Sequence, residues 1–526
     1  MKRILSGLII LATGMVALAQ NESDALLFSL SKPTGTARSI SLGGAMGALG
    51  GDLSAISINP AGVAVYRSSE FSFTPSLTYT QTKSAYNGTR TDDDKFSVPL
   101  QQIGFVGTYK PMRDVSSGLV STHFSIGYNR TNSFSRNTYI QGSGLQSSLL
   151  DEFVHYAEGN VPKQLDNFYQ GIAYDVELLN LLPGIDDAYF NAFEYLNPTG
   201  ENSYSIERGP LYGINQGKVI SEKGNSGEFS IAGGANFSHK LYLGASLGIT
   251  TLYYDMNSQH YEEAASGPQG IYTEAYYSTR ESNGYRILDN FTFNDNVNTT
   301  GIGINLKVGV IYKPVNSVRL GVAVHTPNFY SMDMEYESDV KASYFDGTTI
   351  LPESIPTGNF SYNFRTPWKY TLSGAYIFGE KGLISVDYER TDYSSMKYKS
   401  KGGSFQEMNK MDVLNDLISE TYQGTNNLRF GAEYRFSEAL SFRGGYATYQ
   451  NPYKKVFLNS GGTHQTFSGG LGYRVNNMFL DFAYLLRKES DIHSLYYSPD
   501  VEPEVQPVAE IDTNTHQFAV TVGWKF

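Results

Sequence analysis

The sequence contains one short pattern that is typical of a catalytic nucleophile. Gly244-Ala245-Ser246-Leu247-Gly248 matches the G-x-S-x-G elbow, in which a strained strand-to-helix turn exposes the serine. Leu241 to Ile249, however, alternate apolar and small residues with a period of two, which predicts a strand with no helix after it. We interpret the match as coincidental and expect no catalytic residue.

Two further residues, His155 and Glu158, could bind a metal ion. They lie on a predicted loop helix, but a zinc site needs three or four protein ligands, and a lone pair is more often on the surface. No P-loop is present. We therefore expect no enzyme activity, no cofactor and no metal; a hydrolase with a Ser/His pair in a barrel wall is the alternative left open.

The last ten residues, Gln517–Phe526, predict a membrane-facing strand. The residues that share one face are Phe518, Val520, Val522, Trp524 and Phe526. Period-two alternation indicates a strand, and an aromatic-rich apolar face opposite a mixed one suits a barrel strand in lipid. A final strand ending in phenylalanine is similar to the terminal signature of bacterial outer-membrane barrels. This similarity implies that the barrel-assembly machinery is a partner, through Phe526.

The N-terminus predicts export. Lys2 and Arg3 precede an apolar stretch that ends near Leu18, and the small residues before Gln20 indicate a signal peptide, residues 1–19, cleaved after Ala19. The stretch is shorter than the roughly 20 residues of a membrane-spanning helix. Removing two basic residues takes the formal net charge from −12 to −14, which disfavours nucleic acid as a partner.

The composition agrees with an exported barrel. The 526 residues include 40 Tyr, 30 Phe and 53 Gly, and the mean hydropathy is only −0.31. Tyrosine suits membrane interfaces, where the ring is apolar and the hydroxyl is hydrated. The chain has no cysteine, which excludes a disulfide framework and a lipoprotein anchor. A water-soluble β-sandwich is the alternative.

The alternation recurs along the chain and predicts about fourteen strands. They are Glu70–Gln81, Pro99–Tyr109, Gly118–Arg130, Gly227–Ser238, Lys240–Tyr254, Gly301–Tyr312, Ser317–Met332, Phe360–Phe378, Gly382–Tyr393, Asn427–Phe436, Ala439–Gln450, Gln465–Arg474, Asn477–Arg487 and Thr513–Phe526. An even number, with alternately short and long connections, is typical of bacterial barrels with periplasmic turns and extracellular loops. We therefore expect an all-β, antiparallel transmembrane barrel over residues 69–526, with long loops at 131–226, 257–300, 333–359, 394–426 and 488–512.

The long loops contain apolar residues at helical spacing. This pattern predicts loop helices at Leu149–Ala157, Leu165–Leu182 and Met408–Tyr422. We expect them to lie over the barrel mouth, and we favour this arrangement over a folded extracellular domain in Thr131–Ser226.

The mature N-terminal segment, residues 20–68, predicts a small helical hatch. Gly43, Gly47 and Gly51 are four apart, so on a helix they would form one smooth face for close backbone contact. Asn59-Pro60 then ends the helix, because the residue before proline avoids the α conformation. A segment this rich in small residues fits a barrel lumen; a flexible periplasmic tail is the alternative.

Residues Ala37–Gly62, ARSISLGGAMGALGGDLSAISINPAG, resemble the hatch of the FadL/TodX family of outer-membrane channels for long-chain fatty acids and hydrocarbons. The resemblance includes the Asn59-Pro60-Ala61-Gly62 signature, and Asn427–Ala447 and Phe467–Arg474 are similar to late strands of the family. The resemblance implies a plugged barrel, passive uptake and lateral release of ligand through the wall. Some relatives carry secreted proteins and others are described as haemin receptors, so both stay open as alternatives.

Cationic residues on the lumen side of the strands could hold an anionic head group. Where the apolar face points to lipid, the residues between it point inward. The candidates are Lys307, Arg319, His325, Arg429 and Arg443. Barrel lumens are polar by default, and Asp387, Glu389, Glu433 and Asp481 also point inward, so simple ion pairing is the competing interpretation.

Overall fold

The computed structural model describes residues 22–32, 34–111, 117–200, 203–402, 405–455, 458–462, 464–499 and 506–526. The expected signal peptide and its cleavage site at Ala19 lie outside these residues.

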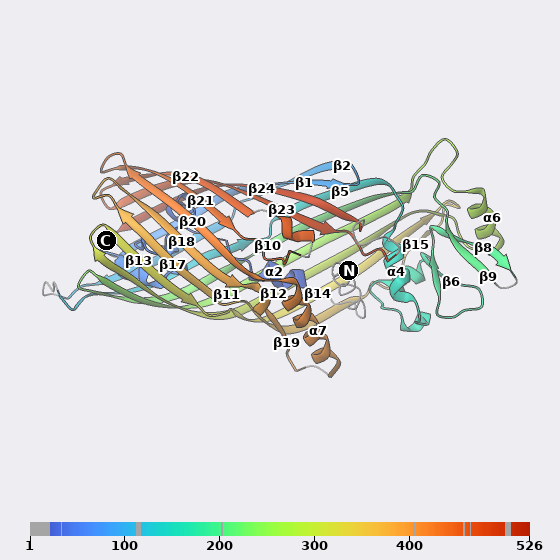
Figure 1. Ribbon diagram of the computed structural model, residues 1–526, viewed down its shortest axis with the longest axis horizontal. Helices are drawn as coiled ribbons and strands as arrows, with labels where there is room; N and C mark the ends of the chain where they lie inside the picture. Colours follow the sequence, from blue (N-terminus) through green and yellow to red (C-terminus); the bar gives the residue numbers. More distant parts are fainter. Residues whose placement is uncertain are drawn as a thin grey trace.

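The molecule is built around a closed antiparallel barrel of fourteen strands (Figure 1). In order around the wall the strands are β1 (Glu70–Tyr86), β3 (Leu100–Tyr109), β4 (Leu119–Ser133), β10 (Ile214–Phe237), β11 (Leu241–Ala264), β12 (Leu288–Val315), β13 (Val318–His325), β17 (Lys369–Ile377), β18 (Gly382–Asp392), β20 (Gly424–Arg435), β21 (Leu440–Tyr449), β22 (His464–Val475), β23 (Met478–Ser494) and β24 (Val508–Lys525). Pairing of β24 with β1, from Lys525 opposite Glu70 to Glu510 opposite Ala85, closes the ring. The expected fold is confirmed.

Short turns join the strands at one end of the barrel. The β10–β11 corner contains Ser238 and His239 with φ of 54°, and Asn476 in the β22–β23 turn has φ of 52°. These left-handed conformations let two neighbouring strands reverse over very few residues. The C-terminal Phe526 lies at the same end, where its backbone N–H donates to Ser69 (2.9 Å). Short turns on one side are the periplasmic pattern of bacterial barrels.

Several strands continue far beyond their expected ends. Strands β10 and β11 have 24 residues each and β12 has 28, so about half of the segment 257–300, expected as a loop, is strand. Inward residues such as Leu288, Phe291 and Phe293 are buried against protein rather than exposed to a lumen. The alternation therefore persists outside the membrane, because one face of the sheet still covers a core.

Two expected strands are interrupted. Ser317–Met332 divides into β13 and β14 (Phe329–Tyr344), and Phe360–Phe378 divides into β16 (Thr357–Arg365) and β17. A Thr-Pro pair stands at each interruption, Thr326-Pro327 and Thr366-Pro367. Proline has no backbone N–H and cannot donate to a ladder, so the two adjacent strands lose regular pairing at the same level.

Further strands line the extracellular half of the wall. They are β2 (Thr89–Ser97), β5 (Arg136–Leu145), β14, β15 (Thr349–Ile350), β16 and β19 (Lys397–Ser400). Strand β2 pairs with β1, β5 with β10, and β14 with β12. A one-turn helix η4 (Tyr393–Ser395) precedes β19, helix α7 (Phe405–Thr421) packs against both, and η5 (Leu458–Gly461) precedes β22.

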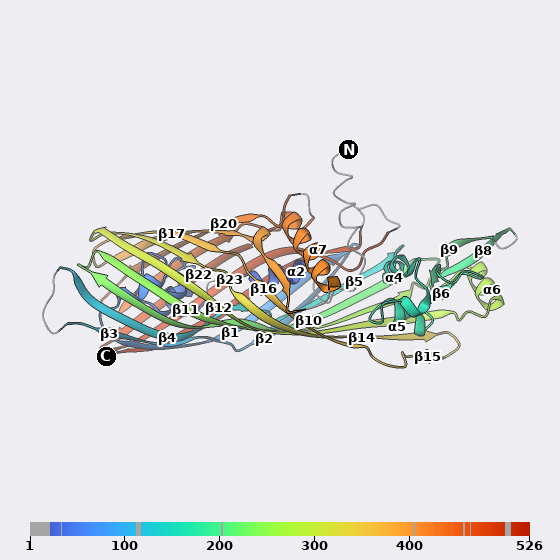
Figure 2. The same ribbon diagram turned by 90° about the horizontal axis from the view of Figure 1, so that it is seen from below.

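The long connections fold into one extracellular module rather than separate loop helices, which corrects the expectation for Thr131–Ser226 (Figures 1 and 2). Its elements are α4 (Leu149–Ala157), η3 (Pro162–Gln164), α5 (Gln170–Asp175), β6 (Leu179–Leu181), β7 (Tyr189–Asn191), β8 (Glu194–Gly200), β9 (Ser203–Arg208) and α6 (Glu274–Ser282). Their apolar residues pack with those of the extended strands into a single hydrophobic core, in which Phe153, Phe193 and Tyr276 are buried. Helix α4 has its expected bounds, whereas only Gln170–Asp175 of Leu165–Leu182 is α-helical.

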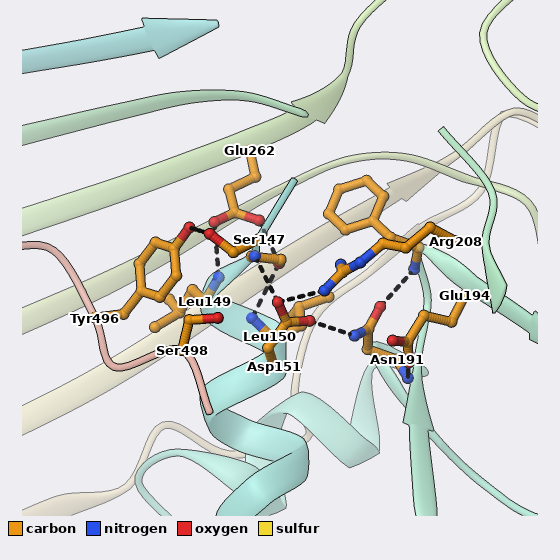
Figure 3. Close-up of polar contacts among 12 residues, drawn as sticks. Ser147, Leu149, Leu150, Asp151, Asn191, Glu194, Arg208, Glu262, Tyr496 and Ser498 are labelled. Carbon is orange, nitrogen blue, oxygen red and sulfur yellow. Dashed lines mark hydrogen bonds and ion pairs between the residues drawn. The ribbon is translucent and has the colours of Figure 1, made fainter. Parts of the chain in front are cut away.

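A buried polar network fixes α4 to the wall (Figure 3). Glu262 of β11 accepts hydrogen bonds from the Leu149 backbone N–H (2.9 Å) and the Ser148 hydroxyl (2.5 Å) at the helix N-terminus. Asp151 completes a capping box with Ser148 and pairs with Arg208 of β9 (2.5 Å). Because an isolated buried carboxylate is unfavourable, these bonds hold the module in one position on the barrel.

Candidate ligand site in the barrel lumen

The hatch lies inside the barrel, where Figure 2 shows its blue segments between the strands. It consists of α3 (Ala37–Ser41) and the short 3₁₀ helices η1 (Leu53–Ser57) and η2 (Pro60–Val65). The Asn59 side chain holds it to the wall: its amide donates to the carbonyls of Gly47 (2.7 Å) and Val310 (3.2 Å), and its oxygen accepts from Ala61 N–H (3.0 Å). Pro60 occupies the first turn of η2, where its missing N–H is harmless, and Gly62 fits against Gly50. The Asn-Pro-Ala-Gly signature thus has a direct structural reason.

The hatch glycines make close backbone contacts, but not on a helix as expected. Helix α3 ends at Ser41, and Gly43 and Gly51 have φ of +62° and +64°. A Cβ on Gly43 would lie 3.0 Å from the backbone nitrogen of Tyr446, and one on Gly47 would meet the Ser373 side chain. The helical spacing is therefore coincidental, since the positions need turns and tight packing against the wall.

A second helix, α2 (Glu22–Ser29), lies in the lumen on the extracellular side of the hatch (Figure 1). Ala25, Leu26 and Phe28 are buried in an apolar cluster of the wall and of α7, rich in methionine and aromatic residues. The Tyr422 hydroxyl donates to the backbone oxygen of Glu22 (3.1 Å) and ties the helix to α7. Methionine and aromatic side chains adapt to irregular apolar partners, so this surface would also accept a hydrocarbon chain.

Two cavities flank the segment that follows α2. The lower cavity, about 110 Å³, lies between this segment, the hatch and the wall. The upper cavity, about 290 Å³, lies toward the mouth. Both are lined by Leu30, Ser31 and Lys32, which we call the strap. The strap is fixed by an ion pair of Lys32 with Glu489 of β23.

Three of the five expected cations meet at the lower cavity, namely Lys307, His325 and Arg429. Lys307 pairs with Glu228, which also accepts from Asn305 (2.8 Å). Arg429 pairs with Glu389 at 2.7 Å. Two of these three side chains thus have carboxylate partners, of which Glu228 is buried and Glu389 is half-buried, as the ion-pairing interpretation requires.

The other expected cations have different surroundings. His325 bonds the Ile58 carbonyl of the hatch through Nε2 (2.9 Å). Arg319 donates to the Leu49 carbonyl of the hatch (2.5 Å). Arg443 is sandwiched between Glu433 (2.9 Å) and Asp481 (2.6 Å), away from the lower cavity. Arg319 and His325 therefore position the hatch, and Arg443 holds strands together.

Lys369 at the start of β17 is a cavity residue that sequence reasoning missed. It lines the lower cavity and donates to the Ser31 hydroxyl of the strap. Among the described residues it forms no ion pair with a carboxylate, and neither does Arg130 on the same cavity. The sequence shows that Lys369, Thr371 and Ser373 alternate on the inward face. It does not show that a strand begins at Lys369, because the expected strand runs without a break from Phe360 to Phe378.

The wall beside the lower cavity contains a seam. Backbone pairing of β3 with β4 ends at Gln102 and Asn129. Farther along, no backbone ladder joins β2 to β5 in the part of the chain that the structure describes. Side chains bridge the gap instead: Lys95 donates to Asn137 (3.0 Å), and Arg130 donates to the Leu100 carbonyl (3.1 Å). The strap and Thr34 cover the seam on the lumen side. The Lys32 backbone N–H donates to the Thr131 carbonyl (3.0 Å), and the Thr34 hydroxyl donates to the Arg130 carbonyl.

The catalytic and metal patterns considered in the sequence have no supporting geometry. Ser246 lies within uninterrupted β11, paired on both sides, so it lacks the turn and helix of a nucleophile elbow. Glu158 ends α4 and accepts from the Tyr189 N–H (2.9 Å). In the parts of the chain that the structure describes, no group of three potential ligands is arranged to hold a metal ion. The same parts include no helix that is long and apolar enough to span a bilayer.

A closed barrel with a hatch and α2 in its lumen defines a plugged outer-membrane barrel. A family model described as outer membrane protein transport protein (OMPP1/FadL/TodX) matches residues 237–526. The chain belongs to this family, whose members transport hydrophobic compounds through the outer membrane.

Solved structures share the fold at low sequence identity. A FadL homologue of Pseudomonas aeruginosa is 13% identical, with a TM-score of 0.53 and coverage of 95% of this chain and 100% of that one. The toluene transporter TbuX of Ralstonia pickettii is 14% identical, with a TM-score of 0.50 and coverage of 95% and 99%. No curated protein matches the sequence.

Proposed function

We propose that the protein takes up a small amphipathic compound with an apolar chain and an anionic head, namely a long-chain fatty acid, by passive diffusion. The observation that carries this choice is Lys369, a half-buried cation in the lower cavity with no carboxylate partner among the described residues. A carboxylate would form a charge-assisted bond there, whereas an aromatic hydrocarbon would leave the cation without a partner.

Movement of the strap would create a site of sufficient size. The two cavities together hold about 400 Å³, within the roughly 300–1,000 Å³ of small-molecule sites, but the strap divides them. Breaking the Lys32–Glu489 pair would join them, with the head group at Lys369 and the chain against the apolar cluster around α2.

The ligand would then leave laterally, through the seam between β3 and β4. A gap closed by side chains opens at lower cost than a backbone ladder, because each net hydrogen bond contributes only about 1 kcal/mol and fewer must break. The same strap that divides the cavities covers the seam, so one movement would both admit and release the ligand.

Mass spectrometry of the ligand carried by the purified barrel tests the proposed function. Co-purified fatty acid supports it. A co-purified secreted protein would instead support a carrier in protein secretion, and haemin would support a haemin receptor.

Cross-linking across the seam tests the route. Because the chain has no cysteine, Lys95→Cys with Asn137→Cys, whose side chains bridge the seam, provides the only thiols for a short bifunctional reagent. Cross-linking should stop uptake by the variant but not binding. The control pair Val324→Cys and Tyr370→Cys, opposite each other in a regular ladder, should be unaffected. Unchanged uptake through a cross-linked seam would refute lateral release at this place.

A further inference from the structure

The lipid-facing surface has a hollow on its periplasmic half. The largest part, about 740 Å³, lies over strands β13, β17, β18, β20 and β21. A second part of about 470 Å³ adjoins it and extends to the β17–β18 turn. Both parts are lined by Ile384, Ala432 and Gly444, so they form one continuous depression, which we call the outer hollow.

The outer hollow results from small residues at outward positions. Gly374, Ala432 and Gly444 replace the large side chains that point to lipid elsewhere on these strands. No heavy atom of a neighbouring residue lies within 4 Å of a Cβ built on Gly444. Aromatic and aliphatic side chains such as Ile384 and Phe430, which are 50% and 44% exposed, form the rim. A depression with an apolar rim in a hydrocarbon solvent must be filled by hydrocarbon, because an empty gap loses dispersion contacts.

The length of the outer hollow matches one leaflet. It runs from Lys381 in the turn to about Val386, five residues along β18. At a rise of about 3.3 Å and a tilt near 45° this covers about 12 Å of depth. That is about half of the roughly 25 Å apolar band of such barrels. A chain that starts at the periplasmic surface would therefore end near the middle of the membrane.

The periplasmic end of the outer hollow carries a positive charge. Lys381 lines this end and is exposed, while its neighbour Glu380 does not line it. A lysine at the membrane surface attracts an anionic lipid head group. We propose that the outer hollow binds one acyl chain of an anionic phospholipid of the periplasmic leaflet, with its phosphate at Lys381.

Native mass spectrometry with phosphatidylglycerol in a mild detergent tests this site. The wild-type barrel should retain one phospholipid, and Ala432→Phe should lose it, because the phenylalanine ring would fill the space that the acyl chain occupies. Ala245→Phe, also at an exposed outward position but on β11, is the matched control and should retain it. Heat-modifiable mobility should show that all variants are folded.

The head-group contact has a separate test. Lys381→Gln should weaken retention about fivefold, the usual contribution of one lysine near an anionic membrane surface, whereas Lys240→Gln in the β10–β11 turn should have no effect. Equal retention by Ala432→Phe and wild type, or retention of free fatty acid instead of phospholipid, would overturn the proposal. Neither result depends on what binds in the lumen.

Discussion

Replacement of Lys369 by glutamine should distinguish a carboxylate ligand from a neutral one. Lys369 is the lysine of the lower cavity that has no carboxylate partner among the described residues. Its one side-chain hydrogen bond to those residues goes to the Ser31 hydroxyl. Glutamine keeps most of the length of the side chain and one donor but removes the charge. A fatty acid should therefore lose affinity, and its methyl ester should lose little.

The size of the effect follows from the surroundings of Lys369. A hydrogen bond to a charged group in a partly buried site contributes about 1.5–3 kcal/mol, which corresponds to a loss of roughly ten- to 150-fold in affinity. The neighbouring cations Lys307 and Arg429 are already neutralised by Glu228 and Glu389, and Arg130 is held by the Leu100 carbonyl at the seam, so none of the three is placed to replace the lost charge. For the ester, only an ordinary hydrogen bond is exchanged, and the change should stay within about threefold.

The assay is competition of palmitate and methyl palmitate against a fluorescent fatty acid bound to the purified barrel. Lys240→Gln, in a turn at the periplasmic end, removes the same charge far from the cavity and is the control. An equal loss for acid and ester, or no loss for either, would refute an anionic head group at Lys369. A neutral hydrocarbon would then be the favoured ligand.

Three other changes have defined outcomes. Deletion of Gln20–Arg38 should raise uptake in a liposome assay while heat-modifiable mobility stays normal, because ring closure does not depend on this segment; failure to assemble would make the segment structural. Lys307→Met should destabilise the barrel by about 3–5 kcal/mol in urea titrations, since Glu228 is left buried without its partner, and Lys307→Met with Glu228→Gln should recover most of the loss. Burial raises the pKa of Glu152 in the extracellular module to about 7, so the folded module keeps a proton that the unfolded chain loses near pH 4.5. The module should therefore become easier to digest with protease as the pH rises from 5 to 8, and a Glu152→Gln variant that shows the same pH dependence would disprove this cause.

The barrel could be predicted from the sequence because lipid on one side and lumen on the other impose a period of two on every strand. Phe518 to Phe526 and Ile302 to Val310 show this pattern without ambiguity. The expected strands run through Pro327 and Pro367, although proline within a strand is a direct sign of lost pairing. Lys369 was missed for the same reason, since it begins the strand after the second interruption.

The features that depend on distant contacts could not be predicted. The extracellular module has one core only because Phe153, Phe291 and Tyr496, from three separate connections, meet in space. Gly43 and Gly51 share a helical spacing, and only the positive φ of each shows that the chain turns there. The carboxylate partners of Lys307 and Arg429, Glu228 and Glu389, lie on other strands. The sequence alone therefore does not show which of the expected lumen cations are neutralised.

The length of β12 also determines how far the protein extends from the cell surface. With 28 residues, a rise of about 3.3 Å and a tilt near 45°, the strand reaches about 65 Å along the barrel axis, and only about 25 Å of this lies in the apolar band. Most of the remainder stands above the bilayer and carries the module at its tip. Antibodies, phages and proteases therefore encounter the module first, while the ligand path lies tens of ångströms behind it. Variation of the module's exposed surface can thus alter recognition of the cell without changing the compounds that the barrel takes up.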